Sequence, residues 1–210
     1  MAGRKFDSSR RNWLRTMLAA AGVIAADGLV GATSWSSIFT LVTFGDSILD
    51  CARYNEFGVH PGQLIVRNDD DLFPEFEHRD LFSLGLAHLD HRAVDGATVS
   101  SLPRQAQGLL VEGPAVALVA IGGNDLIEGL AADRGGEGIQ RFKQELDAFL
   151  HRLPIRPILL GNVYDPTFGD DSRNFLTVDA SIARPNFNRV NAVIKELAPR
   201  YGQFVDLHQH

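Results

Sequence analysis

The fold is decided by Phe39-Thr40-Leu41-Val42-Thr43-Phe44, a run that is followed at once by Gly45-Asp46-Ser47. Its β-branched and aromatic residues are typical of a short strand, and Gly45 predicts a sharp turn at the end of that strand. A second run, residues 115–121, is apolar throughout and stops at Gly122-Gly123-Asn124-Asp125. Strands that are apolar on both faces are typical of parallel sheets covered by helices. The sequence therefore predicts an α/β fold in which polar residues follow buried strands.

Further elements fit the same architecture. Strands are predicted at residues 157–161 and 203–207, with a weaker one at 92–94. Apolar residues at helical spacing predict one helix over 139–153 and another that begins at Pro185. In open parallel sheets, ligands bind beyond the carboxyl ends of the strands. The residues that directly follow the strands are therefore the candidates for a functional site.

The composition is that of a globular chain. It has 210 residues, 45% of them hydrophobic and 22% charged, which suits one domain or a domain with a short appendage. The net charge is −6, and no long run of Lys or Arg occurs after the leader, so a nucleic acid is not expected as a partner. The one cysteine, Cys51, cannot form an internal disulfide.

Residues 1–32 are expected to be either a twin-arginine export signal or a disordered leader. Residues 9–15 read Ser-Arg-Arg-Asn-Trp-Leu-Arg, which resembles the usual form of that signal, and an apolar stretch over 17–26 follows. The stretch is too short for a membrane span. Export to the periplasm is one expectation and a cytoplasmic location is the alternative. In both cases residues 33–210 are expected to form a single domain.

Two of the strand ends carry residues suited to acyl transfer. A serine at a strand-to-helix turn, such as Ser47, has its hydroxyl where backbone N–H groups favour developing negative charge. Gly122 and Gly123 allow close approach of a ligand, and Asn124 adds an amide donor of the kind that an oxyanion hole needs. Each segment alone is more typical of a helix cap or a plain turn. Their occurrence together, at successive strand ends, indicates a common site.

The order of these segments resembles the sequence blocks of the SGNH/GDSL hydrolases. The first three blocks correspond to Thr43-Phe44-Gly45-Asp46-Ser47, then Gly96, then Gly122-Gly123-Asn124-Asp125, and Asn162-Val163-Tyr164-Asp165-Pro166 is similar to the fourth. The resemblance spans Leu41 to the carboxyl end. The other serine-hydrolase signature, Gly-x-Ser-x-Gly, does not occur in the sequence.

This resemblance implies a flavodoxin-like α/β/α sandwich with a five-stranded, mostly parallel sheet. It also implies that Ser47 is the nucleophile. The oxyanion hole would be formed by the backbone N–H groups of Ser47 and Gly96 and by the Asn124 side chain. No cofactor and no metal are expected, and the partner would be a small-molecule ester.

The general base is the point at which the sequence departs from the family. The family has Asp-x-x-His near the carboxyl end, whereas this chain ends Asp206-Leu207-His208-Gln209-His210. On an extended backbone residues 206, 208 and 210 point the same way, so Asp206 could orient either imidazole. We expect His208 to be the base, with His210 or a residue beyond position 210 as alternatives. His60 is a minor candidate.

The other histidines, namely His78, His88, His91 and His151, are predicted to be solvated on the surface. The expected function is hydrolysis of carboxylic esters through an acyl-enzyme on Ser47. Two alternatives remain: a non-catalytic SGNH-like binding module and an acyltransferase on the same fold. The length of the acyl chain and the oligomeric state cannot be predicted from this sequence.

Overall fold

The computed structural model describes residues 38–207 of the chain. The predicted leader therefore lies outside the described residues, as do His208 and His210. The described part contains one five-stranded sheet in the order β2-β1-β3-β4-β5, and every neighbouring pair of strands is parallel. The strands are β1 (Phe39–Gly45), β2 (Ala87–His91), β3 (Ala115–Ala120), β4 (Ile158–Gly161) and β5 (Gly202–Val205). This strand order is the flavodoxin-like one, so the predicted fold class is confirmed.

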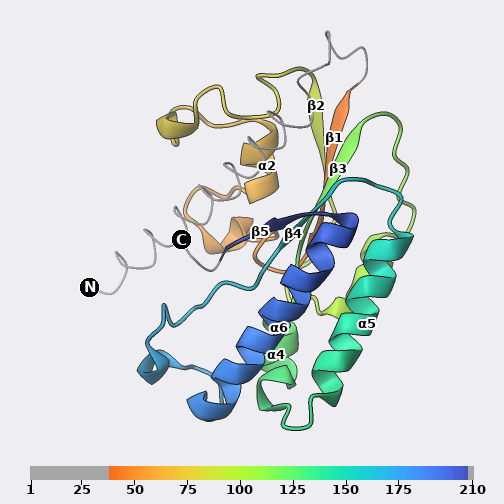
Figure 1. Cartoon of the computed structure of the whole chain (residues 1–210). Helices are drawn as coiled ribbons and strands as arrows, with labels where there is room; N and C mark the ends of the chain where they lie inside the picture. Colours follow the sequence, from red (N-terminus) through yellow and green to blue (C-terminus); the bar gives the residue numbers. More distant parts are fainter. Residues whose placement is uncertain (1–37, 208–210) are drawn as a thin grey trace.

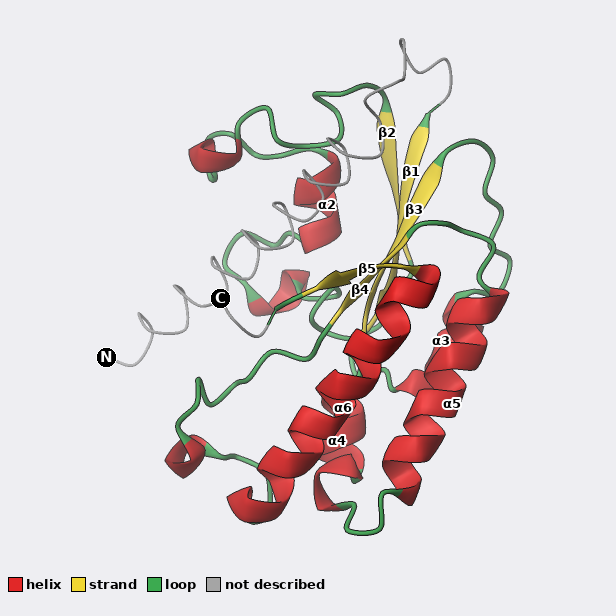
Figure 2. Cartoon of the chain, in the orientation of Figure 1, coloured by secondary structure: helices red, strands yellow, loops and turns green. Residues whose placement is uncertain are grey.

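Helices cover both faces of the sheet (Figure 1). Long helices pack together on one face, while α2 and a series of short turns lie on the other (Figure 2). None of the helices within residues 38–207 is long and apolar enough to cross a membrane. The α-helices are α2 (Pro61–Val66), α3 (Leu102–Gln105), α4 (Gly123–Glu128), α5 (Glu137–Arg152) and α6 (Ala180–Tyr201), and the 3-10 helices are η1 (Ala52–Tyr54), η2 (Pro74–Phe76), η3 (Val99–Ser101), η4 (Leu130–Ala132) and η5 (Asp171–Arg173).

The sheet separates two hydrophobic clusters. Along β1, Val42 and Phe44 face the cluster beneath α5 and α6, whereas Leu41 faces the cluster beneath α2. This alternation follows from the two-residue period of a strand. The apolar stripe predicted for residues 139–153 is the buried face of α5, and the stripe that includes Val190, Ile194 and Leu197 is the buried face of α6. The core thus fixes the positions of the strand ends.

The weak strand predicted at residues 92–94 is wrong, because the strand on this side, β2, ends at His91. The N–H groups of Arg92 and Val94 nevertheless donate to the carbonyl oxygens of Thr43 and Gly45, so this segment continues to follow β1. Strand β2 lies at the sheet edge and is only partly buried, with His88 exposed. An edge strand of this kind lacks the continuous apolar run that identifies a central parallel strand.

The predicted start of the last helix is also wrong. Helix α6 begins at Ala180, and Pro185 lies inside the helix rather than in its first turn. The start is set by Asp179, whose side chain accepts a hydrogen bond of 2.8 Å from the Ser181 N–H. An aspartate at this position satisfies one of the free amide groups of the first turn.

Gly45 allows the end of β1 to lie directly against β3. Its φ is +140°, and a Cβ atom at this position would lie 1.9 Å from the carbonyl oxygen of Ala120. Both backbone polar groups of Gly45 bond to the side chain of buried Gln105, with the Gly45 N–H donating over 2.9 Å and the Gly45 oxygen accepting over 2.8 Å. No side chain can be accommodated here without moving the backbone.

We therefore predict that Gly45→Ala lowers the free energy of unfolding by about 3 kcal/mol or more, because the methyl group meets backbone and the φ is unfavourable. The matched control is Gly108→Ala. Gly108 also has a positive φ, +66°, but has open space around its Cβ position. This control should cost only about 1–2 kcal/mol for the backbone conformation. Equilibrium urea unfolding measures both, and equal losses would show that the contact with Ala120 is unimportant.

Candidate active site

The candidate site lies where the strand order reverses. The chain runs from β1 outward to β2 and then returns to β3 on the other side of β1, so the loops after β1 and β3 leave in opposite directions. Such a switch point creates a crevice beyond the carboxyl ends of the strands. Ser47 follows β1 and Asn124 follows β3, and both line one pocket at this edge. The serine and the asparagine singled out from the sequence are thus brought together.

Ser47 is half-buried and sits in a single helical turn. The carbonyl oxygen of Asp46 accepts the N–H groups of Leu49 and Asp50, and an Asp46 carboxylate oxygen accepts the N–H of Ile48 over 3.0 Å. The expected helix after the serine is therefore reduced to one turn, which is held by Asp46. The Ser47 hydroxyl makes no hydrogen bond to another described residue.

Asn124 occupies the second residue of α4 and connects two strand ends. Its amide nitrogen donates a hydrogen bond of 3.0 Å to the carbonyl oxygen of Ala97, in the loop after β2. An amide nitrogen carries two hydrogens, so one donor remains for a ligand in the pocket. Gly96, the residue before Ala97, is exposed with a φ of +78° and is not among the residues that line the pocket. The structure therefore places Gly96 beside the pocket rather than within it.

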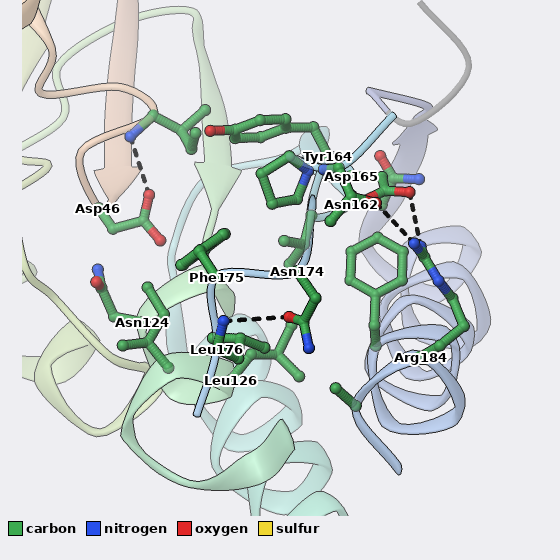
Figure 3. A pocket seen from close by; sticks show the side chains of 18 of the residues that line it. Asp46, Asn124, Leu126, Asn162, Tyr164, Asp165, Asn174, Phe175, Leu176 and Arg184 are labelled. Carbon is green, nitrogen blue, oxygen red and sulfur yellow. Dashed lines mark hydrogen bonds and ion pairs between the residues drawn. The ribbon is translucent and has the colours of Figure 1, made fainter. Parts of the chain in front are cut away.

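The far wall of the pocket comes from residues 162–176, of which the sequence indicated only 162–166, through their similarity to the fourth block. This crossing segment leads from β4 to α6 and adds apolar and polar side chains to those near Asn124 (Figure 3). Phe175 and Ile127 are 61% and 56% exposed, so apolar surface is accessible there. The apolar lining residues are Ile48, Ala120, Ile121, Leu126, Ile127, Val163, Pro166, Phe175, Leu176, Ala180, Ala183 and Phe187.

An ion pair fixes this crossing segment to α6. Arg184 donates to the carboxylate of buried Asp165 over 2.6 Å (Figure 3), and Thr167 donates to the same carboxylate over 2.7 Å. Burial alone would raise the pKa of Asp165, but the hydrogen bonds from Thr167 and Arg184 outweigh it and lower that pKa. Asp165 is therefore ionised and anchors the segment.

Two other acidic groups near the serine behave in the opposite way. Asp46 is 2% exposed, and burial raises its pKa to about 7, assisted by the nearby charge of Asp125. Burial likewise raises the pKa of Asp125 to about 6, although its carboxylate accepts the N–H of Val99. One carboxyl group that lines the pocket, Asp46, and a second beside it, Asp125, thus hold protons more tightly than ordinary aspartates do.

The carboxyl-terminal candidates lie partly outside the described residues. Asp206 follows β5, and one of its carboxylate oxygens accepts a hydrogen bond of 2.9 Å from the side-chain amide of pocket residue Asn162. His208 and His210 are beyond the described range. Within residues 38–207, no histidine lines the pocket.

Two histidines lie elsewhere at the same sheet edge. His91 was expected to be solvated, but it is only 22% exposed and its Nδ1 lies 2.8 Å from the Thr43 hydroxyl. Its ring stacks on that of His60, with ring centres 4.2 Å apart. The surface prediction for His91 is therefore wrong, because β2 begins earlier than expected and turns this residue toward β1. His60, the minor candidate base, belongs to this stack and does not line the pocket.

The electrostatics predict how stability depends on pH. Asp46 and Asp125 bind protons more tightly in the folded chain than in the unfolded chain, where a carboxyl has its ordinary pKa of 3.8. Their contribution to the free energy of unfolding is therefore full below that value and is lost as the pH rises through about 6 to 7. For Asp46, this contribution is on the order of 4 kcal/mol.

Urea unfolding at a series of pH values from about 5 to 8 measures this slope. The variant Asp46→Asn cannot titrate and should flatten the slope, leaving the part that is due to Asp125. The control is Asp71→Asn, which removes a carboxyl exposed in a loop. An unchanged slope in Asp46→Asn would mean that Asp46 is ionised in the folded chain at neutral pH.

Solved structures with a similar fold include esterases and a hydrolase. The acetylxylan esterase Axe2 from Geobacillus stearothermophilus is 17% identical over 80% of this chain and 76% of its own, with a TM-score of 0.55. The acetyl xylan esterase AlAXEase is 19% identical over 81% and 78%, also with a TM-score of 0.55. LAE5, an α/β hydrolase enzyme from the metagenome of Lake Arreo in Spain, is 18% identical over 84% and 79%, with a TM-score of 0.53. At these identities the similarity concerns the fold.

A search of curated proteins found no match to the sequence. The family comparison is more specific, since the sequence model of the GDSL-like Lipase/Acylhydrolase family matches residues 43–210. This range begins in β1 and includes Ser47, Asn124 and the whole crossing segment. The chain therefore belongs to the GDSL-like lipase/acylhydrolase family and is a hydrolase of ester bonds.

Proposed function

We propose that this hydrolase is a serine esterase that works through an acyl-enzyme on Ser47. The observation that carries the proposal is the position of Ser47 and Asn124 in one pocket, at the ends of neighbouring strands. A serine hydroxyl and an amide donor at a switch point are suited to attack on a carbonyl and to stabilisation of the resulting oxyanion. One described variant of Axe2, in which a serine is replaced by alanine, is called a catalytic mutant of that esterase.

In the first step the Ser47 oxygen forms a bond to the ester carbonyl carbon while its proton passes to a base. The oxyanion is held by the Asn124 amide, with the Ser47 N–H as a second donor and the N–H of Gly96, which lies beside the pocket, as a third. The intermediate then releases the alcohol, which takes up the proton. In the second step water adds to the acyl-enzyme by the same route and frees the acid and the serine.

We assign the base to His208, oriented by Asp206. The support for this assignment is the hydrogen bond from the pocket residue Asn162 to Asp206, because it holds the carboxylate at the edge of the sheet where the pocket opens. A carboxylate held in this way can fix the tautomer of an imidazole. His210 and a residue beyond position 210 are the alternatives.

The second candidate function is a non-catalytic binding module. It is favoured by one observation, namely that the pocket within residues 38–207 contains no histidine. The two functions differ in the reactivity of Ser47, because only a serine with a base beside it reacts rapidly with a fluorophosphonate. Labelling that depends on Ser47 would support the esterase, and a folded chain that resists labelling would support the binding module.

The activity of a Ser47 variant tests the assignment of the nucleophile. Ser47→Ala should reduce the hydrolysis of p-nitrophenyl acetate by at least about 10³-fold, because it removes the hydroxyl on which the proposed acyl-enzyme forms. The control is Ser100→Ala, which removes an exposed serine in η3 that does not line the pocket. Circular dichroism should show that both variants are folded. Full activity of Ser47→Ala would refute the assignment of the nucleophile.

The kinetics of an Asn124 variant test the assignment of the oxyanion donor. Asn124→Ala should lower kcat by about 10²–10³-fold with little change in KM, because an oxyanion donor acts mainly in the transition state. The substitution also removes the bond to Ala97, so the melting temperature is measured alongside. Stability that falls with an unchanged kcat would assign Asn124 to loop packing alone.

A further inference from the structure

A second cluster of polar side chains lies at the same sheet edge but outside the pocket. It consists of Asp50 at the end of the serine turn, His60 just before α2 and His91 at the end of β2. One possible ligand atom from each residue lies within 4.8 Å of the other two, and all three side chains are partly buried. None of the three lines the pocket. Three separate parts of the chain therefore bring a carboxylate and two imidazoles to one point.

The distances show that both imidazoles face the same oxygen. Oδ1 of Asp50 lies 3.7 Å from Nδ1 of His60 and 3.7 Å from Nε2 of His91. Both separations exceed a hydrogen bond. The two rings stack at an interplanar angle of 24°, which directs their edges toward the carboxylate from the same side. The three groups thus converge without satisfying one another.

The hydrogen bonds of the two imidazole rings indicate that the centre of the cluster lacks a donor. His60 Nδ1 accepts a weak hydrogen bond of 3.3 Å from the Ala52 N–H, so it carries a lone pair rather than a proton. Nε2 of His91 is buried and has no hydrogen-bond partner among residues 38–207. When the His91 Nδ1–H donates to Thr43, Nε2 also presents a lone pair to the carboxylate.

Two ring lone pairs and a carboxylate oxygen are acceptors, and acceptors placed together are stabilised by a cation. We propose that Asp50, His60 and His91 form a binding site for one divalent transition-metal ion. The ion is assigned as Zn²⁺, because Zn²⁺ binds well to imidazole and carboxylate ligands. A fourth position would be filled by water. Bonds of about 2.0–2.2 Å in a tetrahedron hold ligand atoms about 3.3–3.5 Å apart, so a contraction of a few tenths of an ångström brings the 3.7 Å pairs into place.

The outer contacts of the cluster fit this role. The other carboxylate oxygen of Asp50 accepts the Asp95 N–H over 2.9 Å, and Nδ1 of His91 is held by Thr43. Metal ligands in proteins are commonly oriented by such hydrogen bonds on their far side. Binding would exchange the Ala52 bond to His60 for a metal bond and would join the serine turn to β2 and α2. Metal binding should therefore stabilise the fold.

The test uses the full chain, stripped with a chelator and then dialysed against Zn²⁺. We expect one bound zinc per chain and a higher melting temperature in its presence. His91→Ala and His60→Ala should each lose both effects. The matched control is His88→Ala, which removes an exposed histidine from the same strand and should change neither. This readout does not depend on ester hydrolysis, so it is independent of the proposed function.

The carboxyl-terminal His208 and His210 are a separate source of zinc ligands, and the double variant His208→Ala/His210→Ala separates the two sources. The proposal requires that this double variant still binds one zinc and is still stabilised by it. Zinc binding that survives in folded His60→Ala and disappears in the double variant would overturn the proposal, as would failure of the intact chain to retain zinc. If His91→Ala does not fold, His60→Ala decides the question, because His60 lies at the start of α2 rather than in a strand of the sheet.

Discussion

The site depends on the close approach of β1 to β3 at Gly45. The Ala120 carbonyl oxygen occupies the space that a side chain at residue 45 would need, and it also accepts the Asp46 N–H over 3.2 Å. The contact with the Ala120 carbonyl oxygen fixes the position of the serine turn relative to the residues that follow β3. Because Gln105 bonds to both polar groups of Gly45, the turn is fixed from a third element as well. The separation of Ser47 and Asn124 is thus determined by backbone, not by flexible side chains.

The cost of this arrangement is a buried carboxyl group. The Asp46 carboxylate caps the serine turn by accepting the Ile48 N–H. In this position the Asp46 side chain has almost no contact with water. Burial favours the neutral form of Asp46, and Asp125 lies close enough to add to the effect. Asp165, across the pocket, is less deeply buried than Asp46 and stays ionised because Arg184 and Thr167 compensate its charge. Carboxyl groups at one edge of the sheet therefore differ in charge according to their depth and their partners.

Much of this architecture could be predicted from the sequence because burial leaves a clear pattern in the central strands. The runs at residues 39–44, 115–121 and 157–161 are largely apolar, and the residues predicted to form a common site after two of them, Ser47 and Asn124, do line one pocket. The parts that were missed lack such a pattern. Strand β2 is a polar edge strand, which also explains the error over His91. The crossing segment 162–176 is held by specific hydrogen bonds rather than by periodic apolar residues, so only residues 162–166 were indicated, through their similarity to the fourth block, and the contribution of the rest to the pocket was not predictable.

The serine turn connects the two clusters at this edge. Ser47 faces the pocket, while Asp50, at the other end of the turn, faces His60 and His91. The Asp46 carbonyl oxygen at the start of the turn accepts the Asp50 N–H at its end over 3.0 Å, so the two ends of the turn are joined. Asp50 also accepts the N–H of Asp95, the residue before Gly96. A cation on Asp50 would thus act on the two loops that bear the proposed nucleophile and a proposed oxyanion donor. None of its three ligands lines the pocket, so it would act on these loops from outside the pocket.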